Sequence, residues 1–378
     1  MHRLRAVIVV LVVSLFSIVG VQAQTDPVKQ TFFLTYVPNI QFAPVYVAIE
    51  KGDFKEANLD IQLQNGDENV GVDLVAANQL QFGLISAEEV IKARANERPV
   101  VQVYEWFQKY PIGIVVSDAS GIESVKDLKG HKVGIPGRFG ASYNALTALL
   151  TANGMTEKDI DLQEIGYNAP DVFCVGAVEA AVVYVNNEPL QIQQRADAGN
   201  CNGIKTVKVF PVSDSVDMVS NGVMTNEQTI KDNPQLVTDM VKAFDAGLRE
   251  TINNPAEAYL LSLKYVENMP ATDEFKAALE EAVTAQDKFL ATNPDRTAVV
   301  DSRTALLKTL SGKFDAATLV QFEVLLNTID LWDADHLGLA DKASWDVTQK
   351  VLTDMKFVTT PIDVSKAFTN DFLPPESK

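Results

Sequence analysis

The chain has 378 residues, of which 47% are hydrophobic, and a formal net charge of −18 at pH 7. So large an excess of acidic residues argues against nucleic acid and anionic membrane surfaces as partners, because both are negatively charged. The hydrophobic content excludes a disordered chain, and the length predicts two lobes, since one core seldom organises more than about 250–300 residues.

Residues 1–23 have the pattern of a secretory leader. A basic start, MHRLR, precedes an apolar run at 6–21, and Val21-Gln22-Ala23 is a small-x-small cleavage signature. We therefore expect an exported protein whose mature chain begins near Gln24, located in the periplasm or at the outer face of the cell membrane. Retention of the leader as an uncleaved anchor is the alternative.

Residues 36–54, YVPNIQFAPVYVAIEKGDF, predict a strand end, a loop and a helix. The β-prone run 31–36 stops at Pro38, and apolar residues then recur at helical spacing up to Gly52, which suits a left-handed cap. Ligands of open α/β sheets usually lie above such a strand end. The loop side chains combine aromatic faces with amides and so suit a flat, polar, uncharged heterocycle: Tyr36, Asn39, Gln41 and Phe42. An ordinary βα turn is the alternative.

Strands and helices then alternate at short spacing up to residue 106, which is typical of a parallel sheet. Strands are expected at 59–63, 80–85 and 99–106, helices at 71–78 and after Ser86, and a polar loop at 65–69. Ser86 suits the N-cap of its helix, and Glu88 and Glu89 suit the first turn. Trp106 and Phe107 are adjacent at a strand end, so at most one of them is expected to face a cleft.

Pro111 and Gly113 interrupt this pattern and predict a first crossover into a second lobe. Its strands are expected at 114–116, 132–135, 180–185 and 205–210, its helices at 124–128, 144–153 and 172–179, and the return crossover at 214–225. The turn 136–143, PGRFGASY, has glycines that would let backbone N–H groups approach an anion or a carbonyl. It lacks the lysine of a P-loop and the spacing of a dinucleotide fingerprint, and a plain tight turn is the alternative.

The pattern becomes helical from residue 233 onward. Helices are expected at 237–251, 256–267, 273–291, 295–311, 316–328 and 343–355, packed on lobe one, with Trp332 and Trp345 as packing residues. Cys174 and Cys201 either form a disulfide, which export would permit, or are two unpaired thiols. The histidines are scattered and no His/Cys spacing resembles a zinc site, so we expect no metal.

Three stretches together resemble one family: residues 36–54, VKDLKGHKVG at 125–134 and NNEP at 186–189. They are similar to solute-binding proteins of ABC importers, in the branch related to thiamine-pyrimidine biosynthesis proteins and to nitrate, sulfonate and taurine binders, and most like its riboflavin-binding members. The resemblance implies a two-lobed, periplasmic-binding-protein-like α/β fold with two crossovers and a helical C-terminal tail. Lobe one would span 24–112, an inserted lobe two 113–213, and the return to lobe one with the tail 214–378.

The resemblance further implies that a ligand binds in the cleft between the lobes. Lobe one would contribute Tyr36, Asn39, Gln41, Phe42, Ser86, Glu88 and Trp106, and lobe two Arg138, Phe139, Ser142, Tyr143, Tyr184, Asn186 and Glu188. Aromatic rings would stack on an isoalloxazine, amides would pair with its dioxopyrimidine edge, and carboxylates would accept from the ribityl hydroxyls. A single Arg138 is little positive charge for a phosphate, which favours riboflavin over its phosphorylated forms.

Riboflavin would be the transported ligand and not a cofactor, and the partners would be permease and ATPase subunits on other chains. We expect a monomer that meets the membrane only through the permease. The alternatives are a binder of a thiamine-pyrimidine precursor or another small solute, a sensory protein that presents its closed form to a receptor kinase, and a thiamine-pyrimidine synthase. Related yeast synthases carry a cysteine-rich motif and lack a leader, so we expect no enzymatic activity here.

Overall fold

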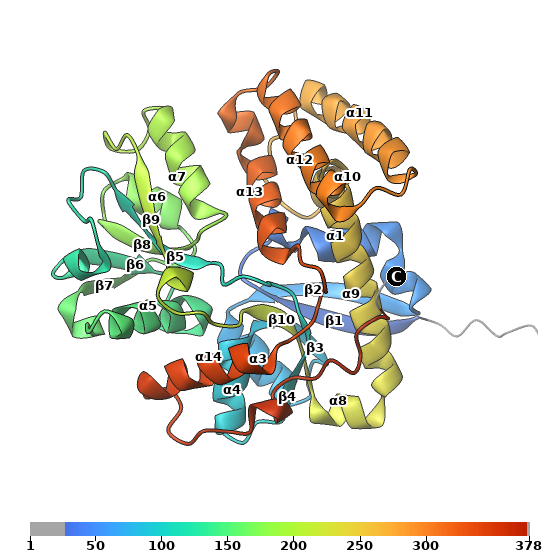
Figure 1. The fold of residues 1–378 in the computed structure, drawn as a ribbon, viewed down its shortest axis with the longest axis horizontal. Coiled ribbons are helices and arrows are strands. Elements are labelled where there is room, and N and C mark those ends of the chain that lie inside the picture. The colour runs from blue at the N-terminus through green and yellow to red at the C-terminus, as the bar shows by residue number, and fades with distance from the viewer. Residues whose placement is uncertain (1–26, 376–378) are drawn as a thin grey trace, which may run out of the picture.

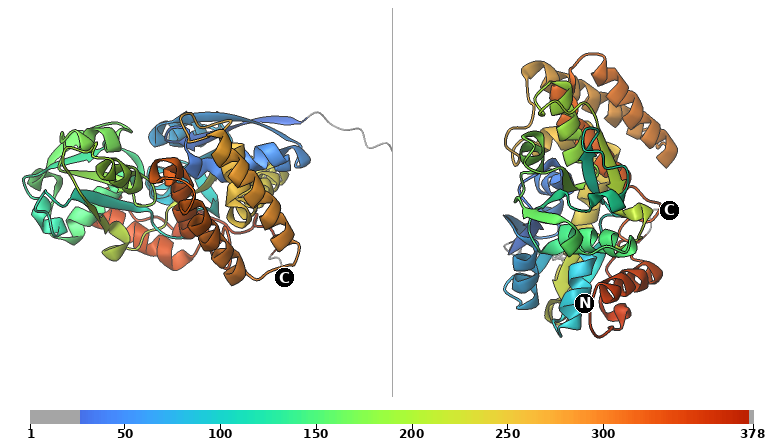
Figure 2. Two further views of the ribbon diagram at one scale, coloured as in Figure 1. Left: turned by 90° about the horizontal axis from the view of Figure 1, so that it is seen from above. Right: turned by 90° about the vertical axis from the view of Figure 1, so that its left-hand side faces the viewer.

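The structure is a computed structural model that describes residues 27–375, so the expected leader lies outside the described residues. Within this range the chain forms two lobes, each built on one five-stranded sheet, and the lobes lie side by side (Figures 1 and 2). The predicted two-lobed α/β fold with two crossovers is confirmed. Residues 27–375 include no helix that combines the length and hydropathy needed to cross a membrane.

The sheet of lobe one has the strand order β2-β1-β3-β10-β4. Its strands are β1 (Val28–Thr35), β2 (Leu59–Gly66), β3 (Phe82–Ser86), β4 (Val100–Glu105) and β10 (Asn221–Asn226). The connecting helices are η1 (Ile40–Phe42), α1 (Ala43–Lys51), α2 (Asp53–Glu56), α3 (Glu68–Ala76) and α4 (Ala87–Ala95). Gly52 ends α1 with φ +90°, as its place after the apolar run predicts.

The sheet of lobe two repeats this plan in the order β7-β6-β8-β5-β9. Its strands are β5 (Ile112–Ser117), β6 (Lys132–Ile135), β7 (Asp161–Glu164), β8 (Ala180–Tyr184) and β9 (Val207–Pro211). The helices are η2 (Val125–Leu128), α5 (Gly140–Ala152), η3 (Glu157–Asp159), α6 (Ala169–Cys174), α7 (Glu188–Asp197) and η4 (Val212–Asp214). The strand β7 and the helix α7 are absent from the sequence prediction, and α6 is shorter and earlier than the helix predicted at 172–179.

The strands of lobe one up to residue 106 run parallel to one another, as predicted, but each sheet also contains one antiparallel strand. The strand that follows each crossover, β5 in lobe two and β10 in lobe one, runs antiparallel to both of its neighbours. The reason is geometric: the crossing chain enters each sheet from the edge that faces the other lobe, where the parallel strands end. The two crossovers are adjacent, because the backbone N–H groups of Trp106 and Phe107 both donate to the Asn221 carbonyl oxygen at 3.0 Å.

The remaining elements form a helical tail. They are α8 (Glu227–Asp232), α9 (Pro234–Asn253), α10 (Pro255–Ser262), α11 (Asp273–Leu290), α12 (Arg296–Ser311), α13 (Ala316–Trp332), α14 (Lys342–Asp354) and η5 (Val364–Lys366). The helix α9 packs on α1 so closely that a Cβ at Gly247 would lie 2.2 Å from the Pro44 carbonyl oxygen. Trp332 and Trp345 are fully buried, as expected of packing residues.

The tail also contacts lobe two, which the sequence prediction of packing on lobe one alone does not include. The helix α13 packs against α7, and α14 lies between α4 of lobe one and α5 of lobe two (Figure 1). A buried hydrogen bond of 2.9 Å joins the Val219 N–H of the return crossover to Thr348 Oγ1 of α14. The tail therefore contributes to the contact between the lobes.

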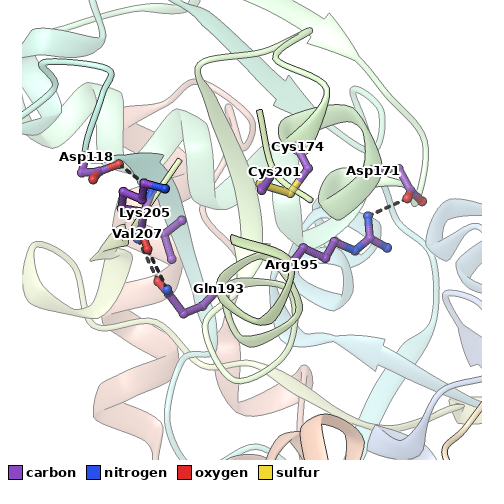
Figure 3. The surroundings of a disulfide bond; sticks show 8 residues. All are labelled: Asp118, Asp171, Cys174, Gln193, Arg195, Cys201, Lys205 and Val207. Atoms are coloured by element: carbon purple, nitrogen blue, oxygen red, sulfur yellow. Dashed lines mark hydrogen bonds and ion pairs between the residues drawn. A yellow bond between two sulfur atoms is a disulfide. The ribbon is translucent and has the colours of Figure 1, made fainter. Parts of the chain in front are cut away.

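A disulfide joins Cys174 at the end of α6 to Cys201 beyond α7, which confirms the pairing allowed by the sequence. Figure 3 shows an ion pair that also links α6 to α7, since Arg195 Nη1 of α7 lies 2.6 Å from Asp171 Oδ1 of α6. Gln193 Oε1 accepts the Val207 N–H at the start of β9. These three links hold α6, α7 and β9 together.

Candidate functional site

A cavity lies between the two lobes, with about 860 Å³ of empty space that is partly open to solvent. Eight residues predicted for the site line it: Tyr36, Gln41, Phe42, Trp106, Phe139, Ser142, Tyr184 and Glu188. Twelve others complete the lining: Thr35, Glu68, Phe107, Pro136, Gly140, Ala141, Gly166, Tyr167, Ala169, Val182, Val183 and Asn221.

Aromatic rings form much of the cavity wall. Seven of the lining residues are aromatic, and they come from both lobes. The Trp106 ring stacks between the rings of Phe42 and Trp332, with centroid distances of 6.0 and 5.3 Å. Because Trp332 belongs to the tail, the tail fixes the orientation of an aromatic ring in the cavity.

The expectation that at most one of Trp106 and Phe107 faces the cleft is wrong, because both line the cavity. The strand β4 ends at Glu105, so the alternation of side chains along a strand no longer applies to the two residues that follow. Their rings contact each other edge to face, with centroids 4.8 Å apart. The start of the first crossover thus contributes two aromatic rings to the cavity wall.

Tyr36 and Glu188 connect the lobes at the cavity. The Tyr36 hydroxyl donates to Glu188 Oε1 at 3.3 Å, while Glu188 Oε2 accepts the Tyr184 N–H at 2.9 Å. Tyr36 has φ +83° directly after β1, which turns its ring toward lobe two and edge-on to the Tyr167 ring. Burial raises the pKa of Glu188 to about 7 and also raises the pKa of Tyr36, so the tyrosine keeps its proton as a donor.

The predicted amide residues have different positions. Asn186 lies buried behind the lining, and its Nδ2 donates to Gln41 Oε1 at 2.8 Å and to Thr328 Oγ1 at 2.7 Å. Gln41 lines the cavity, oriented by this bond. Asn39 does not line it, because its side chain caps η1 by accepting the Gln41 N–H at 3.0 Å. Asn39 and Asn186 therefore position Gln41.

Ser86 and Glu88, predicted for the lobe-one wall, do not line the cavity. Both are fully buried, at the N-terminus of α4, and Glu88 Oε1 accepts the Tyr110 hydroxyl at 2.6 Å. Burial raises the pKa of Glu88 to about 8. Sequence spacing places Glu88 in the first turn of α4, but it does not show that the side chain is buried behind the cavity wall.

Arg138 and Tyr143, predicted for the lobe-two wall, also lie outside the cavity. The Arg138 guanidinium forms ion pairs with Glu157 and Glu164 on the surface of lobe two. The Tyr143 hydroxyl donates to Glu157 at 2.9 Å, and its ring stacks on Phe357 beyond α14. The turn 136–143 faces the cavity with Phe139, Gly140, Ala141 and Ser142, so the arginine beside them points away.

Glu68 is the charged lining residue that the sequence prediction misses. It falls in the segment expected to be a polar loop, whereas it is the first residue of α3. The sequence carries a signal for this, because an acid shortly before the apolar positions of a helix is typical of the first turn. Glu68 Oε1 accepts the Ser86 N–H at 2.6 Å, and Oε2 accepts the Ala141 N–H at 2.8 Å.

Tyr167 and Gly166 are missed because they follow the unpredicted strand β7. The Tyr167 hydroxyl donates to Asp67 Oδ1 of lobe one at 2.8 Å, a further bond between the lobes. Among residues 27–375, no three His, Cys, Asp or Glu side chains form a group that could hold a metal ion. The described site is thus a largely aromatic cavity, partly open to solvent, with amide, hydroxyl and carboxylate groups on its wall.

Comparison with known proteins gives one family and one fold. Residues 39–258 match the family described as NMT1/THI5 like. A riboflavin-binding protein, RibY, of Chloroflexus aurantiacus is 31% identical over 93% of this chain and 88% of its own length. A 4-amino-5-hydroxymethyl-2-methylpyrimidine phosphate synthase of Legionella pneumophila is 21% identical over 92% of each chain. The structure of the periplasmic aliphatic sulphonate binding protein SsuA of Escherichia coli aligns with a TM-score of 0.56 at 15% identity, covering 93% of this chain and 95% of the other.

Proposed function

The chain belongs to the NMT1/THI5-like family, and on this premise we propose that it is the extracytoplasmic solute-binding subunit of an ABC importer, with riboflavin as its solute. The observation that carries the proposal is the cavity between the lobes with its aromatic wall. The similarity to a riboflavin-binding protein over most of both chains supports the choice of solute. Export through the leader expected at 1–23 agrees with this role.

The chemistry of the wall suits a flavin. An isoalloxazine is flat and apolar on its faces, and each well-placed aromatic contact adds about 0.5–1.5 kcal/mol beyond the burial of area. Its dioxopyrimidine edge alternates acceptors and a donor, which a primary amide such as that of Gln41 can match. The ribityl hydroxyls can donate to Glu188 or pair with Asn221, both of which line the cavity.

Release and capture would follow from movement of one lobe against the other. In the structure the lobes are joined across the cavity by Tyr36–Glu188, Gln41–Asn186 and Asp67–Tyr167 hydrogen bonds. A solute held by both walls is bound fully only when these walls are close, so binding shifts the population toward the closed form. A permease on another chain, driven by a separate ATPase subunit, would recognise that form. The protein would act as a monomer and without a cofactor.

A thiamine-pyrimidine precursor is the second candidate solute, because several relatives are named as pyrimidine phosphate synthases. The same wall would accept a smaller heterocycle with amino and hydroxymethyl groups. We propose binding and not synthesis, since a relative that is 31% identical over most of both chains is named as a binding protein, whereas the synthases of Legionella pneumophila and Candida albicans are 21% and 25% identical.

The test is a titration of the purified protein with riboflavin, followed by flavin fluorescence, with the thiamine pyrimidine in a parallel titration followed by calorimetry. Saturable flavin quenching at micromolar or lower concentration is the expected result. A response to the pyrimidine alone would replace riboflavin by that solute, and a response to neither would refute both. Turnover of the pyrimidine or of the flavin would contradict the binding role.

A further inference from the structure

The Glu68 carboxylate lies where three helix N-termini meet. It begins α3, accepts the N–H of Ser86 at the start of α4, and accepts the N–H of Ala141 in the first turn of α5. The first two helices belong to lobe one and α5 belongs to lobe two. Only 7% of the residue is exposed.

A helix N-terminus attracts anions, because its free N–H groups and its dipole both favour negative charge. The 13-residue helix α5 begins within the glycine-containing turn whose sequence suits an anion cradle. In the structure that cradle holds the protein's own carboxylate. The fit depends on Gly140, since a Cβ there would lie 2.5 Å from Glu68 Oε2 and the residue has φ +65°.

The rest of the described cavity wall has no positively charged side chain that could pair with an anion. The charged residues among the lining are Glu68 and Glu188, and both are acidic. Arg138, the predicted cation, pairs with Glu157 and Glu164 outside the cavity. To reach the N-terminus of α5, a phosphate, sulfonate or carboxylate group would therefore have to displace Glu68 and remain in the same cavity as Glu188.

We propose that Glu68 is a specificity-determining residue: its carboxyl group occupies the anion-binding N-terminus of α5 and so restricts the cavity to solutes without an anionic group. This deepens the proposed function and rests on it, because the solute is taken to bind in the same cavity. Glu68 also explains why an aromatic cavity that could stack a flavin would discriminate between riboflavin and its phosphate ester.

The occupancy holds in both protonation states of the group. Burial and the nearby Glu89 raise the pKa of Glu68, whereas its two backbone N–H donors oppose that rise. As a carboxylate Glu68 repels an anion, and as a carboxylic acid it still fills the space at the Ala141 N–H. Removal of the side chain is therefore a more informative change than its neutralisation.

The experiment compares the wild type with Glu68→Ala and with Glu68→Ser, a second variant that also removes the carboxyl group but keeps a small polar side chain. Glu280→Ala is the matched control, because it removes one negative charge from an exposed position on α11. The first readout is Tm as a function of ethanesulfonate concentration, with chloride keeping the ionic strength constant. The second is the ratio of the dissociation constants of flavin mononucleotide and riboflavin.

We expect ethanesulfonate to raise the Tm saturably in Glu68→Ala and Glu68→Ser but not in the wild type or the control. In the two Glu68 variants, the dissociation constant of flavin mononucleotide divided by that of riboflavin should fall at least about tenfold, equivalent to about 1.4 kcal/mol. The same ethanesulfonate dependence in all four proteins, or an equal gain in Glu280→Ala, would overturn the proposal. If the wild type binds no flavin, the proposed solute is wrong, and the ethanesulfonate readout alone decides the role of Glu68.

Discussion

The Tyr36 hydroxyl of lobe one donates a hydrogen bond to Glu188 Oε1 of lobe two at 3.3 Å, at the wall of the cavity between them. The two residues are 152 positions apart in the chain, on either side of the first crossover. Closure of the lobes therefore also brings together these two residues of the cavity wall.

Tyr36→Phe removes the hydroxyl and keeps the ring. We expect riboflavin affinity to fall about tenfold, because a hydrogen bond to a carboxylate contributes about 1.5 kcal/mol or more. The Tm of the ligand-free protein should change little, and Tyr36→Ala should bind still more weakly since the contact with Tyr167 is also lost. Tyr265→Phe is the control, because its hydroxyl donates to Glu50 on the far side of α1. Equal losses of affinity in Tyr36→Phe and Tyr265→Phe would contradict the assignment.

Stability should fall as the pH rises from about 4.5 to 8. Burial raises the pKa of Glu88 and of Glu105 to about 8 and that of Glu188 to about 7. In this window the folded protein keeps protons that the unfolded chain has released, so the free energy of unfolding decreases with pH, by up to about 1.4 kcal/mol per unit for one group. The measurement is urea denaturation across this range.

Glu88→Gln should flatten that pH dependence, because an amide stays neutral at every pH and still accepts from the Tyr110 hydroxyl. Glu280→Gln, exposed on α11, should leave it unchanged. If the free energy of unfolding of the wild type rises with pH, the buried carboxyl groups are not protonated in the folded protein. The same conclusion would follow if the free energy of unfolding changed equally with pH in the wild type and in Glu88→Gln.

Gly140→Ala should disfavour the closed form. Its Cβ would lie 2.5 Å from Glu68 Oε2 and 3.3 Å from Glu68 Cβ, so the carboxylate would have to leave the Ala141 N–H and α5 would have to shift slightly away from α3. Gly154→Ala, at the other end of α5, is the matched control, because Gly154 has φ +71° with no atom within 4 Å of its Cβ. Both variants carry the backbone cost of a positive φ, and only Gly140→Ala carries the clash. Small-angle X-ray scattering should show a larger radius of gyration for Gly140→Ala alone; equal radii would contradict this contact between the lobes.

Reduction of the Cys174–Cys201 disulfide should destabilise lobe two. The bond closes a loop with a sequence separation of 27, for which chain entropy predicts about 3–4 kcal/mol. We expect the Tm of the wild type to fall on treatment with dithiothreitol. The double variant Cys174→Ser/Cys201→Ser should have the low Tm with or without reductant. A reductant-dependent change in that variant would show that another process is responsible.

Much of the fold follows from local patterns. The strand β6 (Lys132–Ile135) has its predicted bounds, and Gly52 ends α1 where the apolar spacing stops. Interruption of the pattern before β5 predicts the crossover, and an exported chain with Cys174 and Cys201 allows their disulfide. These features depend on a few neighbouring residues, whose propensities and spacing can be read directly.

The composition of the site required the tertiary structure. The family resemblance implies that Glu88 and Arg138 line the cleft, but the fold buries one behind the wall and turns the other to the surface. The Glu68 carboxylate meets the Ala141 N–H from 73 residues away. Periodicity identifies the apolar face of each element, whereas the elements that come to face each other are determined by how two sheets, two crossovers and a tail pack together. The sequence by itself therefore determined the two lobes and most of their elements, and only the tertiary structure decided that an acidic side chain occupies the cradle at α5.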